Sequence, residues 1–252
     1  MASSETVKAA VLIIGDEILS GRTQDINLNA IAKYLGAYGV DVAEARVVGD
    51  EESEIVSALN LLREAYDYVI TTGGIGPTHD DITADCVAAA FGVELYEHPE
   101  IIEMMTTRWS GEINAARRRM ARIPQGGTLV RNPVNGPPGF QIGNVFVLAG
   151  VPQIMRGMLE DVGHRLKGGA VVVSRTVRIE GAGESVIAEP LEAVAKAHPT
   201  LSLGSYPFFS NEGYGSNLVV RGRDAGEVDA TVAELIEVLR STGVPKITEV
   251  DG

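Results

Sequence analysis

The chain has 252 residues, of which 45% are hydrophobic and 22% charged, a composition typical of a folded globular protein. Its formal net charge of −13 at pH 7 argues against a general affinity for nucleic acid or for an anionic membrane. The single cysteine excludes an intrachain disulfide, and no apolar run reaches the roughly 18 residues of a membrane span. Because the N-terminus has no signal-peptide pattern, we expect a cytoplasmic protein with neither nucleic acid nor membrane as a partner.

Strands and helices alternate in the first part of the chain. An apolar run at residues 8–14 predicts a buried strand, and apolar residues at helical spacing follow at 27–38, before a second strand at 40–48. The order repeats with a helix at 51–65 and a strand at 68–70. Such βαβ units predict a parallel sheet covered by helices on both faces, with ligands beyond the carboxyl ends of the strands.

The middle of the chain is less regular. After a Gly-rich loop we expect a helix that reaches Phe91, and residues 99–122 are predicted to be helical. Prolines and glycines then interrupt regular structure until short strands near Phe140 and at 145–148. A further helix is predicted over 151–165.

The glycine pair at residues 168–169 predicts a domain boundary, which gives an α/β domain over 1–169 and a small βαββα domain over 170–252. The predicted fold is a three-layer α/β/α domain with a mostly parallel sheet, followed by a smaller α+β domain. The second domain is expected to contain strands at 171–179, 201–206 and 217–221 and helices at 184–197 and 227–240.

The loop at residues 72–76, Thr-Gly-Gly-Ile-Gly, directly follows the third strand. Adjacent glycines bring backbone N–H groups close to an anion, and the dipole of the following helix adds positive potential. The alternative, given equal weight, is a tight turn that needs glycine for steric reasons. The loop lacks the Gly-Lys-Ser/Thr of a Walker motif.

Two carboxylates follow this loop in the segment Pro77-Thr78-His79-Asp80-Asp81. Carboxylates repel a phosphate unless a cation intervenes, so Asp80 and Asp81 predict a divalent metal, Mg²⁺, Mn²⁺ or Co²⁺, that bridges to phosphate oxygens. Capping of the next helix is the alternative role for Asp81.

Further charged residues are expected near the same edge of the sheet. Asp16 and Glu17 follow the first strand, with solvated loop charges as the alternative, and Asp50 follows the second strand, with helix capping as the alternative. Of the run Arg117-Arg118-Arg119, at most one or two side chains can face one ligand, because successive residues of a helix point in different directions.

Four sequence blocks, taken together, resemble the molybdopterin-binding (MoaB/Mog-type) family. They are Gly-Asp-Glu-Ile-Leu-Ser-Gly at 15–21, the segment at 71–81, Asn-Pro-Val-Asn-Gly-Pro-Pro-Gly-Phe at 132–140 and Gly-Val-Pro at 150–152. Within that family the chain is most similar to the N-terminal part of the competence- and damage-inducible CinA-like proteins. Two departures stand out, since His79 replaces a common proline and Ala149 replaces the proline of the usual Leu-Pro-Gly.

The resemblance implies an α/β/α domain whose crevice accepts molybdopterin-like or nucleotide ligands, with a phosphate on the glycine loop and Asp81 in a catalytic or metal-binding role. Related proteins commonly self-associate, so a homo-oligomer is expected. The candidate ligand-binding residues are Gly15, Ser20, Thr72, Gly73, Gly74, Gly76, Pro77, Thr78, Arg119, Asn132, Pro133 and Gly139; the candidate catalytic residues are Asp50, Asp80 and Asp81; the candidate metal ligands are Asp16, Glu17, Asp80 and Asp81.

Three functions follow from this interpretation. The leading hypothesis is an enzyme, a divalent-metal-dependent pyrophosphatase that acts on ADP-ribose or a related dinucleotide such as FAD. The second is molybdopterin binding or adenylylation in molybdenum-cofactor biosynthesis. The third is a non-catalytic nucleotide-binding module, which the two departures at His79 and Ala149 favour slightly.

Overall fold

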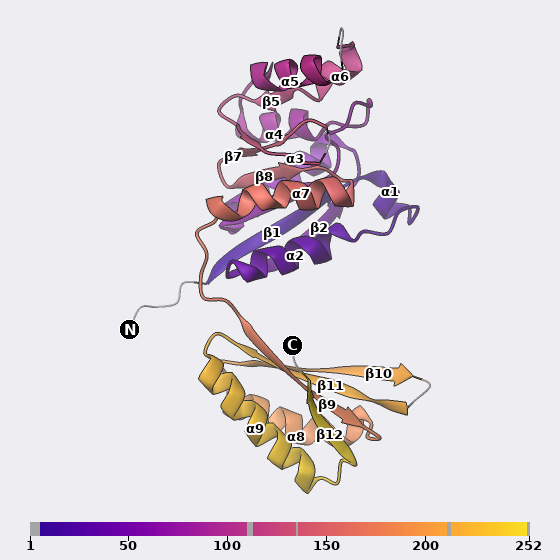
Figure 1. Ribbon diagram of the computed structural model, residues 1–252, viewed down its shortest axis with the longest axis vertical. Helices are drawn as coiled ribbons and strands as arrows, with labels where there is room; N and C mark the ends of the chain where they lie inside the picture. The colour runs from indigo at the N-terminus through magenta and orange to yellow at the C-terminus, as the bar shows by residue number, and fades with distance from the viewer. Residues whose placement is uncertain (1–5, 110–112, 135, 211–212, 251–252) are drawn as a thin grey trace. The chain divides into compact units, whose positions relative to one another are not determined.

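The chain forms two compact units, residues 1–169 and 170–252 (Figure 1). The structure is a computed structural model that describes residues 6–109, 113–134, 136–210 and 213–250. Among the described residues, no helix is long and apolar enough to cross a membrane.

Six strands form the central sheet of the first unit, and its core is parallel. Four adjacent strands, β2, β1, β3 and β8, run parallel to one another. Strand β7 is antiparallel to both β8 and the edge strand β6. In sheet order the strands are β2 (Val40–Val48), β1 (Val7–Ile14), β3 (Tyr68–Thr72), β8 (Val145–Leu148), β7 (Gly139–Ile142) and β6 (Thr128–Val130).

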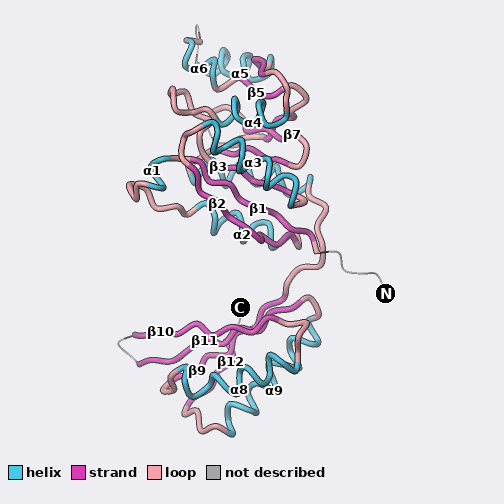
Figure 2. The backbone as a smooth tube through the Cα atoms, turned by 180° about the vertical axis from the view of Figure 1, so that it is seen from behind, coloured by secondary structure: helices cyan, strands magenta, loops and turns pink. Residues whose placement is uncertain are grey.

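Helices cover both faces of this sheet, which confirms the three-layer α/β/α prediction. Helices α2 (Asn27–Ala37) and α7 (Pro152–Val162) bury apolar residues against one face. Helices α3 (Glu52–Ala65) and α4 (Thr83–Phe91) do so against the other face (Figure 2). The sheet is buried on both sides because alternate residues of β1 point to opposite cores.

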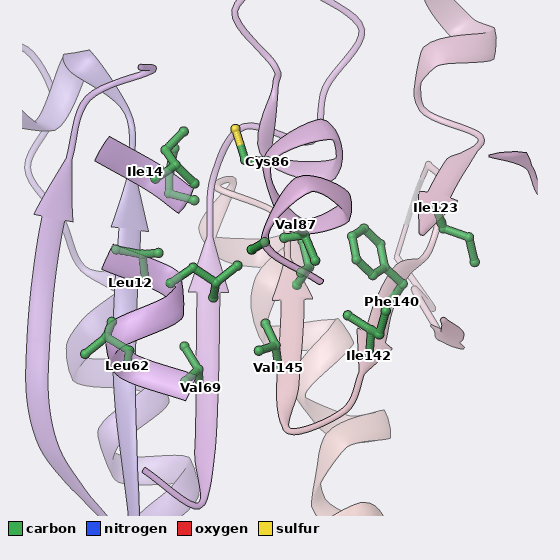
Figure 3. Packing of buried hydrophobic residues seen from close by; sticks show 14 of the residues in the cluster. Leu12, Ile14, Leu62, Val69, Cys86, Val87, Ile123, Phe140, Ile142 and Val145 are labelled. Atoms are coloured by element: carbon green, nitrogen blue, oxygen red, sulfur yellow. The ribbon is translucent and has the colours of Figure 1, made fainter. Parts of the chain in front are cut away.

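One of the two cores is drawn in Figure 3. Leu12 from β1 and Leu62 from α3 pack with Cys86 from α4, and Phe140 and Val145 extend the cluster toward the antiparallel edge. Burying one such large apolar side chain stabilises the fold by about 1.5–3 kcal/mol. These contacts hold the carboxyl ends of β1 and β3 side by side, and the loops that follow them form the site.

The prediction of a continuous helix at 99–122 is wrong. The structure has α5 (Pro99–Trp109) and a short α6 (Ala115–Arg119), and then β5 (Arg122–Pro124) pairs with β4 (Leu95–Glu97). The side chain of Asn114 accepts a hydrogen bond from the Arg117 N–H and so starts a new helix. Residues 110–112 of that prediction lie outside the described residues.

Smaller differences occur elsewhere in the first unit. Asp16 and Glu17 lie in the first turn of a short helix, α1 (Asp16–Leu19), where a loop was predicted. The helix at 151–165 ends earlier, with α7 followed by a 3₁₀ turn, Gly163–Arg165.

The second unit is an antiparallel sheet with two helices. The sheet order is β10-β11-β9-β12, and both helices contribute residues to a core with the sheet. Strand β12, which pairs with β9, is absent from the predicted βαββα order. The elements are β9 (Val173–Glu180), α8 (Glu184–Ala197), β10 (Ser202–Ser210), β11 (Gly213–Gly222), α9 (Ala225–Ser241) and β12 (Lys246–Val250).

Candidate functional site

A cavity of about 650 Å³ lies where the loops after β1, β3 and β8 meet, a size typical of small-molecule sites. The glycine loop, residues 72–76, forms one wall and the start of α7 forms another. The lining residues are Glu17, Thr23, Gly73, Gly74, Ile75, Gly76, Asp81, Met120, Asn132, Gly136, Pro137, Ala149, Gly150, Val151, Pro152, Ile154 and Met158.

The glycine loop requires glycine for steric reasons and also has backbone N–H groups without hydrogen-bond partners in the described part of the chain. A Cβ at Gly73 would lie 2.0 Å from the Ile14 carbonyl oxygen, and one at Gly74 would lie 2.2 Å from the Thr83 hydroxyl. Both glycines have positive φ, +108° and +65°. Among the described residues no group accepts a hydrogen bond from the backbone N–H of Gly74 or Ile75. The turn therefore needs glycine and also presents two N–H groups to an anion.

The Asp81 carboxylate holds the end of the glycine loop by hydrogen bonds. Its Oδ1 accepts a hydrogen bond from the Gly76 N–H at 2.6 Å, and its Oδ2 accepts from the N–H of Thr78 at 2.8 Å and from the Thr78 hydroxyl. The alternative role of helix cap is wrong, because Ile82 occupies the N-cap of α4 without a side-chain hydrogen bond. Asp81 thus shapes the loop rather than the helix.

The acidic residues after three strands lie close enough to interact. The N–H of Asp16 donates to the Asp50 carboxylate at 3.0 Å, and the N–H of Asp50 donates to the Asp16 carboxylate at 3.3 Å. Burial raises the pKa of Asp50, and the negative charges of Asp16, Glu17 and Asp80 raise it further. A cation placed among these carboxylates would relieve that repulsion.

Asp80 differs from Asp50 in its surroundings. Hydrogen bonds from the Thr78 side chain and from its own backbone N–H lower the pKa of Asp80, and the nearby charges of His79 and Arg119 lower it further. Asp80 is exposed, so its ionised carboxylate is available to a ligand. Over the described ranges, no three His, Cys, Asp or Glu side chains are grouped so that they could hold a metal by themselves.

Two arginines, Arg119 and Arg122, line a small recess beside the glycine loop. The Nη2 of Arg119 donates to the Asp81 carbonyl oxygen at 3.3 Å. The buried Nε of each arginine has no hydrogen-bond partner among the described residues. Arg122 forms a two-pronged ion pair with Asp85, at 3.1 and 2.8 Å.

Asn27 is a buried polar residue that the sequence analysis missed. Its side chain is 5% exposed, and its Nδ2 donates to the Thr72 hydroxyl at 2.9 Å and to the Gly150 carbonyl at 2.7 Å. Thr72 in turn donates to the Ala149 carbonyl at 2.9 Å, so it joins two loops behind the cavity. The available signal was that Asn27 lies on the same helical stripe as Ile31 and Leu35.

Several other candidate ligand residues do not line this cavity. Gly15 is buried before α1 and Ser20 caps the exposed end of that helix. Gly139 is buried in β7, where a Cβ would lie 2.2 Å from the Val147 carbonyl oxygen. Pro77 and Thr78 are exposed on the loop after Gly76, and Pro133 lines a second cavity. Of the candidates, Glu17, Gly73, Gly74, Gly76, Asp81 and Asn132 line the cavity.

Comparison with known families agrees with this architecture. Residues 10–168 match the family described as "Probable molybdopterin binding domain". The chain belongs to the molybdopterin-binding domain family. Residues 171–247 of this family member match the model of the FAD synthase middle domain.

Individual relatives carry the CinA name. The chain is 38% identical over 206 residues to a CinA-like protein of Citrifermentans bemidjiense, covering 77% of this chain and 49% of the relative, so it spans about half of that protein. A protein of Archaeoglobus fulgidus is 32% identical over 91% of this chain and 96% of its own length. The structure of CinA from Thermoplasma acidophilum, a protein of unknown function, aligns with a TM-score of 0.60 and 32% identity over 65% of this chain and 99% of that one.

Proposed function

We propose that this CinA-like protein is a divalent-metal-dependent pyrophosphatase that hydrolyses ADP-ribose or a related dinucleotide such as FAD. The observation that supports it most is that the cavity is lined both by Gly74 and Ile75, whose N–H groups have no partner among the described residues, and by Glu17, one of the carboxylates whose charges add to burial in raising the pKa of Asp50. N–H groups suit a phosphate, whereas carboxylates suit a cation.

The carboxylate arrangement fits a cation that completes its coordination with substrate oxygens. Mg²⁺ typically uses one or two carboxylates together with phosphates and waters, so a full protein cage is not required. One or two of the carboxylates of Asp16, Glu17 and Asp80 would hold the cation, which would supply Lewis-acid polarisation of the phosphate. Asp81 takes the role of loop organiser, because its oxygens accept the loop hydrogen bonds.

The remaining residues would then act on the substrate directly. The N–H groups of Gly74 and Ile75 bind phosphate oxygens, and Arg119 offsets the charge that develops there. Asp50, with its raised pKa, accepts a proton from the attacking water. Water adds across the P–O–P bond, and ADP-ribose gives AMP and ribose 5-phosphate.

The test is metal-dependent product release. Purified protein is incubated with ADP-ribose or FAD and Mg²⁺, Mn²⁺ or Co²⁺, and AMP is quantified by chromatography with and without EDTA. We expect AMP only with metal, and an Asp16→Asn, Asp80→Asn double variant should lose about 100-fold or more in rate. Glu64→Gln, an exposed change on α3, is the matched control. Absence of AMP with every metal would refute hydrolysis.

A second function, molybdopterin binding or adenylylation, is favoured by the family match over residues 10–168. It predicts that a pterin copurifies with the protein or binds saturably, and that any AMP transfer to it requires ATP. If ADP-ribose binds tightly to the protein but is not hydrolysed, the chain is instead a nucleotide-binding module.

A further inference from the structure

A second cavity, of about 740 Å³, shares a wall with the first. The wall is the proline segment, residues 132–134 and 136–138. Asn132 lines both cavities, Gly136 and Pro137 line the first, and Pro133 and Pro138 line the second. The two cavities are therefore separated by the thickness of one chain segment.

The small recess that holds Arg119 also borders the proline segment. Its lining includes Gly74 and Gly76 of the glycine loop as well as Pro138. Residues of the glycine loop therefore line both the first cavity and a recess that reaches the proline segment.

The second cavity combines an apolar floor with unpartnered polar groups. Ile101, 1% exposed, Met104 and Leu129 provide the floor. Within the described part of the chain, the buried Nδ1 of His98 has no hydrogen-bond partner and the Arg131 guanidinium forms no ion pair. Arg165 also borders the cavity, but its charge is paired with Asp161.

This lining is complementary to a nucleoside or phosphoribose group. Such a group presents a flat or puckered ring to an apolar floor and offers acceptor oxygens to a guanidinium. In a chain with a net charge of −13, an unpaired arginine beside a cavity is a local attraction for an anionic ligand.

We propose that the second cavity binds the half of the substrate beyond its AMP moiety, the ribose of ADP-ribose or the second nucleoside of a dinucleotide, while the pyrophosphate lies on the glycine loop and the AMP half occupies the first cavity. The inference rests on the proposed function and adds a subsite to it. Arg131 donates to the sugar or base of that moiety, and Met104 packs against its ring.

The test compares binding of a whole dinucleotide with binding of one half. Affinities for ADP-ribose and AMP are measured by calorimetry in EDTA, so that turnover plays no part. Arg131→Ala should weaken ADP-ribose binding about tenfold, as expected for the loss of one charge-assisted hydrogen bond. Met104→Trp should weaken it about tenfold as well, because the larger side chain fills the cavity. Both variants should change AMP binding less than about twofold. Thr107→Trp, an exposed change on the same helix, is the matched control.

Each other outcome overturns the subsite. Unchanged ADP-ribose affinity in both variants, or equal weakening of ADP-ribose and AMP, would place the second moiety elsewhere. Because Arg131 is exposed, its variant remains informative if Met104→Trp does not fold. The proposed function is tested separately by metal-dependent AMP release, so a protein that releases AMP but whose two variants bind ADP-ribose unchanged would overturn the subsite alone.

Discussion

A single carboxylate, that of Asp81, accepts hydrogen bonds from two backbone N–H groups and one hydroxyl of the loop that precedes it. Charge-assisted bonds of this kind are stronger than neutral ones, so the loop conformation is set before a ligand arrives. Its neighbour Asp80 is exposed, and the N–H groups of Gly76 and Thr78 donate to Asp81 rather than to Asp80. The two adjacent aspartates therefore serve different purposes.

That difference predicts different effects of two substitutions. Asp81→Ala should weaken AMP binding about tenfold even in EDTA, because the loop loses the acceptor that orders it. Asp80→Ala should leave binding in EDTA unchanged and reduce only the additional affinity produced by Mg²⁺. Calorimetric titrations with and without the metal measure both quantities. Equal losses for the two variants in EDTA would contradict this division of roles.

Ionised Asp50 should lower the free energy of unfolding at pH 7 although it serves hydrolysis. Its pKa is raised above the ordinary 3.8, first by burial and then by neighbouring carboxylates, so the folded state disfavours its ionised form. Its favourable contribution is present below pH 3.8 and is lost as the pH rises through the folded pKa. Asp50→Asn should therefore stabilise the protein at pH 7, by less than about 1 kcal/mol because the group is partly solvated.

Urea unfolding at pH 7 and pH 3 measures that effect. The gain at pH 7 should vanish at pH 3, where the original carboxylate is also protonated, while hydrolysis of ADP-ribose at pH 7 should fall. A variant that is less stable at pH 7 would contradict the assignment of repulsion to Asp50.

At the scale of elements, the turn after β3 is dictated by close packing of two backbones. Gly73→Ala should destabilise the protein by about 2–4 kcal/mol, because the added Cβ meets the Ile14 carbonyl oxygen and the φ of +108° is strained. Gly36→Ala is the control: it lies within α2 with open space around the Cβ, and it should stabilise by about 0.5–1 kcal/mol. Chemical denaturation of both variants provides the comparison.

The long elements were predictable because their signal is local. The apolar run of β1 and the helical spacing of Ile31 and Leu35 require no knowledge of distant residues. The three-residue strands β4, β5 and β6 are too short to show a period, and their pairing depends on partners far along the chain. The helix break at Asn114 was missed because a capping side chain competes with a favourable helical pattern.

The site was predictable only in part, for a related reason. Spacing after the strands placed the glycine loop and the acidic residues at one edge of the sheet, since parallel strands end together. Spacing does not show which atoms a carboxylate contacts, so the loop-closing role of Asp81 was not visible. The role of Asn27 depends on Thr72 and Gly150, which are distant in sequence.

At the scale of the whole molecule, each unit has its own core. The first unit contains two clusters of buried residues and the second contains one, and none of these clusters includes residues of both units. Each unit satisfies the main condition for independent folding.

A fragment of residues 1–169 should therefore fold alone. We expect a cooperative thermal transition by circular dichroism and protection of the Cys86 thiol like that in the full chain, because Cys86 is fully buried within the first unit. Burial raises the pKa of that thiol to about 12, so reaction with a thiol reagent requires unfolding. Rapid reaction in the fragment, but not in the full chain, would show that the second unit is needed for folding.

The inaccessible thiol has a practical consequence. Because Cys86 is the one cysteine in the chain, cysteines introduced at exposed positions can be coupled to fluorescent dyes while the native residue stays in place. A donor dye on one unit and an acceptor dye on the other would then report by energy transfer how far apart the units stand, and whether a nucleotide brings them closer.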